Sequence, residues 1–254
     1  MPETPSQILR RQLKAIPGAV RLVRFLRSWL VPHERALRQI EARAPGQLLQ
    51  PSPVTGPDRY PDFFAFVADQ LARVPAPRLL SFGCSIGDEV FSLRACFPSS
   101  EIVGLDINPR AIAACRRRLA RLPPDPGIRF ACKGSAGDEA EASYDAIFCM
   151  AVLRHGELQA FRPARCDKIL EFSAVDRTVS ELARCLRPGG FLAIWNCHFR
   201  FADMSVATAF EPVFSSAQGA SANQPLYGPD NRLLPDAPYR DGIFRKRDVS
   251  QSIG

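Results

Sequence analysis

The residues best suited to chemistry lie in a glycine-rich run and at an acid nineteen residues after the second glycine of that run. The run reads Gly83-Cys84-Ser85-Ile86-Gly87-Asp88-Glu89 and follows a short apolar segment; a second apolar segment, 102–105, ends at Asp106. Glycine has no Cβ, so the backbone at Gly83 and Gly87 can turn tightly and approach a ligand. A carboxylate such as that of Asp106 can accept hydrogen bonds from a ribose diol. This order predicts a nucleotide-binding crevice at the carboxyl ends of two neighbouring strands.

The segments around these residues alternate between strand and helix patterns. Strands are expected at 79–82, 102–105, 128–132, 144–149 and 191–196, and helices at 62–74, 88–96, 109–122 and 174–186. Such alternation predicts a parallel sheet with helices on both faces. We therefore expect an α/β fold, a Rossmann-like seven-stranded and mostly parallel sheet. Prolines interrupt the tail after Cys197, so its strands are expected to be short, with 242–246 as the last.

Length and composition fit one such domain with an appendage. The 254 residues are 46% hydrophobic, which predicts a basic helical appendage and linker over 1–60 and the main domain over 61–254. No run of about 18 apolar residues is present, and arginines interrupt any apolar leader, so we expect a cytoplasmic protein. The eight cysteines form no Cys-x-x-Cys pair, which predicts buried free thiols and no metal site.

The positive charge is concentrated near the N-terminus. Residues 1–48 hold nine Lys and Arg against three Glu, or +6 of the total +7. Apolar residues at helical spacing predict one or two helices over 17–43, separated at Pro32. We interpret them as a helical cap with a solvated arginine face; the alternative is peripheral contact with an anionic membrane surface or partner. Residues 48–61 are predicted to form a linker or a lid over a substrate.

Two further motifs give the domain a recognisable pattern. Tyr144-Asp145-Ala146-Ile147-Phe148-Cys149 is a buried strand, and Leu186-Arg187-Pro188-Gly189-Gly190-Phe191-Leu192-Ala193-Ile194 is a helix end, a turn and a strand. Together with the glycine loop and Asp106, they resemble the class I S-adenosylmethionine-dependent methyltransferases over about residues 62–197. The resemblance implies S-adenosylmethionine as cofactor.

The same resemblance implies a role for each matching position. Gly83, Cys84, Ser85 and Gly87 would line the methionine moiety of the cofactor, and Asp106 would hold its ribose hydroxyls. Ile107 would pack on adenine, and Gly134 or Ser135 would lie near the adenine amine. Residues 149–151, with Met150 among them, would form the floor of the site.

Within that family the glycine loop is most similar to the protein-glutamate methyltransferases of chemotaxis. That similarity implies that Glu89 lies close to the ammonium group of the cofactor. The chain departs from those enzymes after the fourth strand, where it continues Met150-Ala151-Val152 instead of the usual Arg-Asn, and it has no clear counterpart of their receptor-docking subdomain. The resemblance therefore implies that the chain binds the cofactor, but it does not imply that glutamate is the substrate.

The expected activity is methyl transfer to an unidentified acceptor, a small metabolite or a glycan, at a hydroxyl or a carboxylate. A hydroxyl acceptor needs a base, and His155, just past the fourth predicted strand, is the candidate catalytic residue. His198 is the second candidate, and for both a purely structural role stays open. Arg154 and Glu157 are interpreted as a solvated pair. A protein carboxyl group is an alternative acceptor.

Three other functions remain as alternatives. Gly83-Cys84-Ser85-Ile86-Gly87 also fits the nucleophile elbow of α/β hydrolases, but the helical region upstream of it and the positions of His155 and His198 do not fit that fold. A nicotinamide dehydrogenase needs a third glycine, and the charges of Asp88 and Glu89 disfavour a pyrophosphate. A non-catalytic module that binds the cofactor is the third. Nucleic-acid modification is not expected, because the basic residues lie away from the glycine loop.

Overall fold

The computed structural model describes residues 32–51, 55–215, 224–235 and 242–248. The chain divides between Pro45 and Gly46 into two units. In the first, helix α3 (Pro32–Arg43) is described, and it begins at the proline that was predicted to separate two helices. Proline is tolerated at that position because its missing N–H has no partner in the first turn. The helix expected before Pro32 lies outside the described residues.

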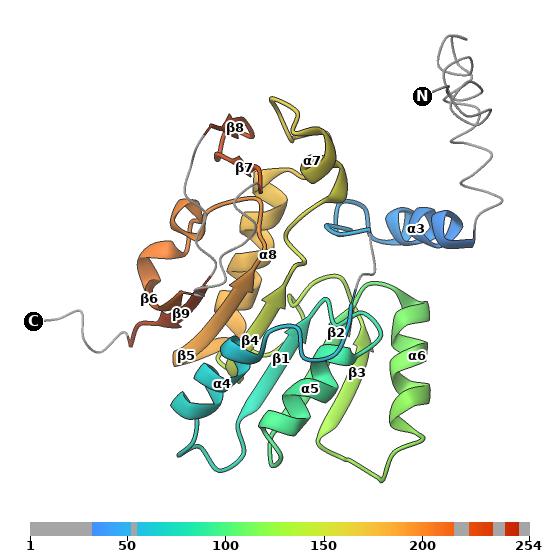
Figure 1. Cartoon of the computed structure of the whole chain (residues 1–254), viewed down its shortest axis with the longest axis vertical. Helices are drawn as coiled ribbons and strands as arrows, with labels where there is room; N and C mark the ends of the chain where they lie inside the picture. Colours follow the sequence, from blue (N-terminus) through green and yellow to red (C-terminus); the bar gives the residue numbers. More distant parts are fainter. Residues whose placement is uncertain (1–31, 52–54, 216–223, 236–241, 249–254) are drawn as a thin grey trace, which may run out of the picture. The chain divides into compact units, whose positions relative to one another are not determined.

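The second unit is built on a seven-stranded sheet (Figure 1) with the order β3-β2-β1-β4-β5-β9-β6. Its strands are β1 (Arg78–Phe82), β2 (Glu101–Asp106), β3 (Ile128–Cys132), β4 (Tyr144–Met150), β5 (Leu186–Trp195), β6 (Phe210–Ser215) and β9 (Gly242–Lys246). The first five pair in parallel, and β9 runs antiparallel to both β5 and β6. The predicted Rossmann-like, seven-stranded and mostly parallel sheet is confirmed.

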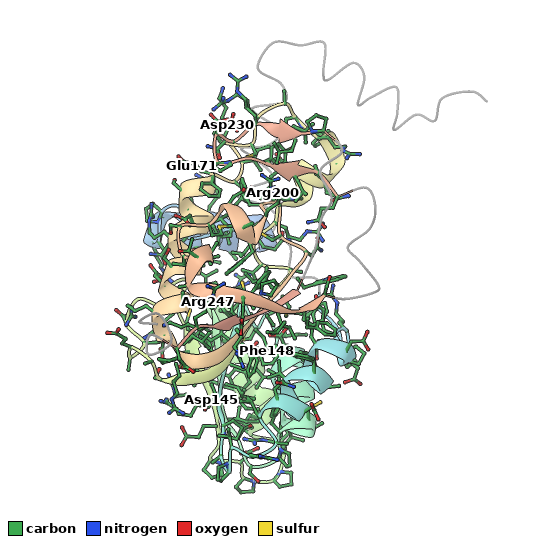
Figure 2. The ribbon with its side chains drawn as sticks, turned by 90° about the vertical axis from the view of Figure 1, so that its left-hand side faces the viewer. Asp145, Phe148, Glu171, Arg200, Asp230 and Arg247 are labelled. Atoms are coloured by element: carbon green, nitrogen blue, oxygen red, sulfur yellow. The ribbon has the colours of Figure 1, made fainter. Side chains whose placement is uncertain are left out.

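Helices cover both faces of this sheet. On one face lie α4 (Pro61–Gln70), α5 (Asp88–Cys96) and α6 (Pro109–Leu119); on the other lies α8 (Phe172–Cys185). Successive strand residues point to opposite faces. On β4, accordingly, Ile147 packs with the α8 side and Phe148 with the α4 side. Figure 2 shows Phe148 among the side chains in the interior. The centroid of its ring lies 5.4 Å from the centroid of the Phe64 ring, and the two rings pack edge to face.

The topology creates a crevice at one place in the sheet. β1 pairs with β2 on one side and with β4 on the other, so the chain leaves β1 in one direction and later returns on its opposite side. Loops after neighbouring parallel strands that diverge in this way leave a gap between them at the carboxyl edge. The glycine loop follows β1, Asp106 ends β2, and the segment 151–155 follows β4. The fold thus brings the predicted site residues to one edge.

The predicted elements agree with the structure in order and type, but α4 and α6 end at Gln70 and Leu119 instead of 74 and 122, and the fifth strand and the tail also differ. β5 begins at Leu186 instead of 191, because the Pro-Gly-Gly turn is an irregularity inside the strand, with Gly189 at φ 73°. β6 contains Pro212, next to a shift in its register with β9. Proline is accepted there because the strand lies at the edge of the sheet.

Several short elements lack a sequence prediction. Helix α7 (Gly156–Phe161), two 3-10 turns (Phe201–Asp203 and Ala207–Ala209) and the hairpin of β7 (Leu226–Tyr227) with β8 (Leu233–Leu234) follow β4 and β5. Parts of the segment between β6 and β9 lie outside the described residues.

No helix within the described ranges is long and apolar enough to cross a membrane. The eight cysteines are all free thiols, and six of them are buried. In the described part of the chain, no group of three His, Cys, Asp or Glu side chains is arranged to hold a metal ion.

Candidate functional site

The glycine loop is a tight turn between β1 and α5. Gly83 and Gly87 have φ values of 75° and 92°, which L residues with a side chain rarely adopt. The N–H groups of Gly83 and Cys84 both donate to the carbonyl of Leu105, at 2.8 and 2.9 Å. The loop is therefore fixed against the end of β2 before the chain enters α5.

Asp106 holds the same loop by its side chain. Its Oδ2 accepts from the N–H of Ser85 and its Oδ1 from that of Asn108, both at 2.8 Å. Burial raises the pKa of Asp106, while these two hydrogen bonds oppose the rise. Each carboxylate oxygen can accept a further hydrogen bond. The predicted ribose contact is thus compatible with the positioning role that the structure shows.

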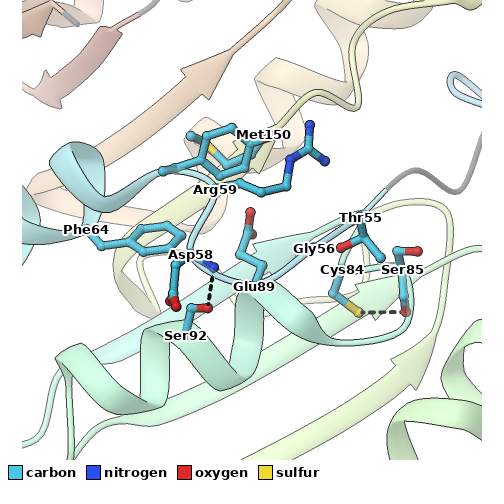
Figure 3. A pocket seen from close by; sticks show the side chains of 12 residues that line it. Thr55, Gly56, Asp58, Arg59, Phe64, Cys84, Ser85, Glu89, Ser92 and Met150 are labelled. Carbon is cyan, nitrogen blue, oxygen red and sulfur yellow. Dashed lines mark hydrogen bonds between the residues drawn. The ribbon is translucent and has the colours of Figure 1, made fainter. Parts of the chain in front are cut away.

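A small pocket lies against the glycine loop (Figure 3). One wall is formed by Gly83, Cys84 and Ser85, and the base by Glu89 and Ser92 of α5. The opposite wall comes from the segment 55–60, with Phe64 of α4 and Met150 at the end of β4. The N–H of Asp58 donates to the Ser92 hydroxyl at 3.2 Å and ties that segment to α5. The region predicted as a linker or lid therefore contributes to the pocket.

Ser85 presents a polar atom that the protein does not satisfy. Its hydroxyl is buried and has no hydrogen-bond partner in the described structure, and its φ of 50° is unusual for a residue with a side chain. A buried hydroxyl without a partner costs about 1–3 kcal/mol. Such a group in a pocket wall indicates a ligand that supplies the missing hydrogen bond.

Glu89 places a second polar group at the base of the pocket. Its Oε1 accepts from the hydroxyl of Ser81 on β1 at 2.7 Å. Burial raises the pKa of Glu89 to about 8, although the Ser81 hydrogen bond and the positive charge of Arg59 both lower it. In Figure 3 the carboxyl group points from α5 toward Arg59 and Met150. A cation that reached this carboxylate would stabilise its charged form.

The remaining predicted cofactor residues lie outside that pocket, beyond Asp106. Ile107 packs against Gly134, where an added Cβ would lie 2.6 Å from Ile107 Cδ1. Ser135 instead faces α8, because its hydroxyl donates to Glu181 at 2.6 Å and accepts from the N–H of Gly137 at 2.9 Å. The structure thus brings Ile107 and Gly134 together, while Ser135 is engaged in the protein's own hydrogen bonds.

His155 caps α7 and does not line the pocket. Its Nδ1 accepts from the N–H of Glu157 at 3.2 Å, so the neutral ring carries its proton on Nε2. Burial lowers the pKa of His155, and the charge of Glu157 opposes this. In this arrangement neither ring nitrogen is free to accept a proton, so a role as base requires the ring to leave its capping position.

His198 is fully buried and engaged at both ring nitrogens. Nδ1 lies 2.9 Å from the Pro225 carbonyl and Nε2 lies 3.2 Å from the His155 carbonyl. Burial lowers the pKa of His198 to about 4 despite these two contacts. The ring joins the segment after β4 to the segment after β5, which is a structural role.

The hydrogen bonds of His155 and His198 do not form the Ser-His pair that a hydrolase would need. A Ser nucleophile requires a histidine within hydrogen-bond reach. In the described structure Ser85 Oγ has no partner, and both His155 and His198 bond elsewhere. The arrangement of Ser85 fits a ligand-binding turn instead.

Sequence comparison agrees with this geometry. Residues 80–192, which run from β1 through the glycine loop to β5, match a family model described as a methyltransferase domain. The match covers less than half of the chain and includes the strands and the glycine loop on which the resemblance to class I methyltransferases rests. It supports S-adenosylmethionine as the cofactor and favours a methyltransferase over the hydrolase and dehydrogenase alternatives.

The curated proteins that match this chain include methyltransferases. The chain is 35% identical over 134 residues to a trans-aconitate 2-methyltransferase of Methylobacterium nodulans, covering 50% of this chain and 42% of that protein. It is 34% identical over 127 residues to a trans-aconitate 2-methyltransferase of Acidovorax sp., covering 49% and 41%. The chain therefore spans about two fifths of the length of these relatives.

One solved structure in the comparison is an amino pentose methyltransferase, CalS10 from Micromonospora echinaspora, with S-adenosylmethionine bound. It is 26% identical, covers 52% of this chain and 49% of that chain, and has a TM-score of 0.37.

Sequence reasoning missed the residues that close this pocket on the side opposite the glycine loop. Asp58, Arg59 and Tyr60 line it together with Phe64. The only sequence signal was the proline-rich segment at 48–61, which predicted a loop but no side-chain role. The contribution of Arg59 becomes visible only when the loop is placed beside Glu89.

Proposed function

We propose that this chain transfers a methyl group from S-adenosylmethionine to a carboxylate oxygen of a small acid. The observation that carries the proposal is the pocket at the carboxyl end of β1, where the unpartnered Ser85 hydroxyl and the buried Glu89 carboxyl share one wall and base. A ligand with a carboxylate and an ammonium group, as in the methionine part of the cofactor, fits this pair of polar groups.

The glycine loop and the residues next to it supply the other proposed cofactor contacts. Gly83 and Gly87 let the backbone approach the ligand, Cys84 lines the pocket, and Met150 borders it at the end of β4. Asp106 would hold the ribose, with Ile107 beside the adenine and the 134–135 turn next to it. The contact proposed for Ser135 is its backbone, since its hydroxyl is bound to Glu181.

When bound, S-adenosylmethionine supplies a methyl group on a positively charged sulfur, so that an acceptor oxygen forms the new C–O bond while the S–C electron pair remains on sulfur. The chain's own task is to bind and orient the two partners in a site without water. A carboxylate acceptor arrives without a proton, and none has to be removed.

The contacts of His155 and His198 favour such an acceptor, because His155 caps α7 and His198 is engaged at both ring nitrogens. No histidine is among the twelve residues that line the pocket. The names of the two curated relatives support the same choice, because trans-aconitate is a carboxylic acid. We therefore propose a small carboxylic acid in preference to a hydroxyl or glycan acceptor.

The prediction that His155 is a base concerns hydroxyl acceptors, and it is testable. Asparagine at this position keeps an N-cap acceptor for the Glu157 N–H but cannot act as a base. A loss of about 10²- to 10⁴-fold in kcat with His155→Asn would indicate general base catalysis. A carboxylate acceptor should show no such dependence on the imidazole.

The proposed function is tested by calorimetry and by product formation. We expect the purified chain to bind S-adenosylmethionine and S-adenosylhomocysteine, and to form methyl esters when small acids, trans-aconitate among them, are supplied. Amides of the same acids serve as controls, because they lack the anionic oxygen. Binding without any product would favour the non-catalytic module; methylation of a protein acid alone would favour a protein carboxyl methyltransferase, the activity to which the chemotaxis resemblance points. Absence of cofactor binding would contradict the proposal.

Cofactor affinity should depend on pH through Glu89. The free protein holds a proton on this carboxyl below about pH 8, and binding the cofactor's ammonium group releases it. Affinity for S-adenosylhomocysteine should therefore fall by up to about tenfold for each unit of pH decrease between 7.5 and 6.0. Glu89→Gln should weaken binding at pH 7.5 and flatten this dependence, as calorimetric titrations would show.

The control for this pH experiment is Glu141→Gln, which removes an exposed carboxylate. It should retain the wild-type profile. A Glu89→Gln protein with the full pH dependence would exclude Glu89 as its source and leave the ammonium contact without support.

A further inference from the structure

The ends of β2 and β3 form one surface beyond Asp106. Asp106 pairs with Cys132 in the parallel register, and the N–H of Lys133 donates to the carbonyl of Asp106 at 3.0 Å. The pairing thus continues to the point where both strands end. There Ile107 packs against Gly134, on which a Cβ would lie 2.6 Å from Ile107 Cδ1 and 3.0 Å from its Cγ1. This surface lies at the carboxyl edge of the sheet, next to the carboxylate proposed to hold the ribose.

A third segment, 46–50, reaches the same surface from a part of the chain that precedes the sheet. Its Leu49 is buried in the hydrophobic core on the α8 side of the sheet, which fixes the segment to the domain. Gln47, two residues earlier, is exposed. Its Oε1 atom lies close to Gly134, 2.8 Å from the position that a Cβ would take there. Because position 134 has no side chain, the Gln47 carboxamide finds room beside Ile107.

The carboxamide of Gln47 is a polar group at this surface that the protein leaves open to a ligand. Within the described ranges, no hydrogen bond or ion pair involves it. Ser135, the neighbour of Gly134, is engaged instead, because its hydroxyl donates to Glu181 at 2.6 Å and accepts from the N–H of Gly137 at 2.9 Å. A carboxamide offers an acceptor oxygen and two N–H donors in one plane. Gln47 can therefore supply the side-chain hydrogen bonds that Ser135 cannot.

We propose that Gln47 recognises the adenine base of the cofactor by its 6-amino group. This inference rests on the proposed function, which puts adenine beside Ile107 and the 134–135 turn. The carboxamide oxygen accepts from the 6-amino group, and the carboxamide nitrogen donates to the ring nitrogen next to it. Glutamine forms this kind of paired contact with adenine in protein–DNA complexes. A residue from outside the sheet thus makes cofactor affinity depend on the amino group of the base.

The test is calorimetry with S-adenosylhomocysteine and with its 6-deamino analogue, in which hydrogen replaces the amino group. Wild type should bind the analogue about 3- to 10-fold more weakly. Gln47→Leu, which keeps the size of the side chain without its polar atoms, should bind S-adenosylhomocysteine about 5- to 30-fold more weakly than wild type and show no preference between the two ligands. Gln47→Glu keeps an acceptor for the amino group but no donor, so it should bind both ligands weakly and retain part of the preference.

The matched control is Gln70→Leu, which removes an exposed carboxamide at the end of α4 and should bind both ligands as wild type does. Thermal unfolding checks that each variant is folded; if Gln47→Leu is not, Gln47→Ala takes its place. A Gln47 variant that lacks the carboxamide but keeps the full preference for the amino group overturns this assignment and leaves the cofactor site intact, even if both ligands bind more weakly. A wild-type protein that binds no S-adenosylhomocysteine overturns the proposed function as well.

Discussion

Replacing Asp106 with alanine is expected to abolish cofactor binding while leaving the sheet folded. The carboxylate accepts hydrogen bonds from the N–H groups of Ser85 and Asn108, each at 2.8 Å. Hydrogen bonds to a charged group contribute about 1.5–3 kcal/mol each. Alanine removes both, together with the proposed ribose contact, so we expect an affinity loss of more than about 100-fold.

The reason for so large an effect is that one side chain serves two purposes. Asp106 ends β2, and its bond to Ser85 fixes the middle of the glycine loop in its unusual φ of 50°. Without the carboxylate, the amide of Ser85 loses its partner and the loop is free to leave the geometry that shapes the pocket. Both the contact and the preorganised loop are lost in one substitution.

Two variants separate these contributions. Asp106→Asn keeps one oxygen acceptor but no charge, and should bind S-adenosylhomocysteine with intermediate affinity. Asp138→Ala, whose side chain is 85% exposed, is a control for loss of a carboxylate elsewhere and should bind normally. Calorimetry gives the affinities, and circular dichroism checks the fold. An Asp106→Ala protein that binds as wild type does would refute the assignment of this carboxylate.

The sheet and the cofactor loop could be predicted because their sequence signals are local. Apolar runs at 79–82 and 144–149 form strands buried on both faces, and such strands need no partner residues to be recognised. Gly83 and Gly87 mark backbone conformations that other residues rarely adopt. The carboxyl edge then follows from parallel pairing, which places Asp106 beside the loop. These predictions need only the order of the segments along the chain and the pattern of apolar residues within each segment.

Side chains on the loops could not be predicted in the same way. The sequence suggested that Arg154 and Glu157 form a solvated pair, but the structure shows no ion pair between them, and Arg154 is partly buried. Its environment is set by the 55–60 loop and by His198, which lie almost a hundred residues before it and more than forty after it. The setting of His155 likewise depends on α7, a six-residue helix that has too few residues to show a periodicity.

The edge of the sheet posed a different difficulty. β6 has its proline beside a register shift, and the strand that pairs with it, β9, begins much later in the chain, at Gly242. An edge strand with a bulge lacks the regular alternation that identifies strands in sequence. The final strand at 242–246 was predictable because it is central, between β5 and β6, and retains its apolar residues.

Gly83→Ala is expected to be the most disruptive single-methyl change in the domain. The new Cβ would lie 2.4 Å from Val152 Cγ2 and 3.2 Å from its Cγ1, at a φ of +75°. The left-handed backbone costs a residue with a side chain about 1–2 kcal/mol. Overpacking adds about 1–3 kcal/mol. We expect lower thermal stability and loss of cofactor binding, since the loop and the segment after β4 must move apart.

Matched glycines in the same chain separate the two costs. Gly46 has a similar φ of +70° with nothing within 4 Å of an added Cβ, so Gly46→Ala measures the backbone cost alone. Gly156 also has open space and no positive φ, and Gly156→Ala should be close to neutral. The difference in unfolding free energy between Gly83→Ala and Gly46→Ala then reports the clash with Val152.

A second substitution tests whether that clash is the cause. Val152→Ala in the Gly83→Ala background removes both γ carbons and should restore part of the stability and of the affinity for S-adenosylhomocysteine, whereas Val152→Ala alone should be mildly destabilising. Residues in contact show such coupling in a double-mutant cycle. If the two substitutions were simply additive, Val152 would not be what holds the glycine loop. Coupling would show that the loops after β1 and β4 form one packed unit, so that a change in either loop would alter the shape of the proposed cofactor site.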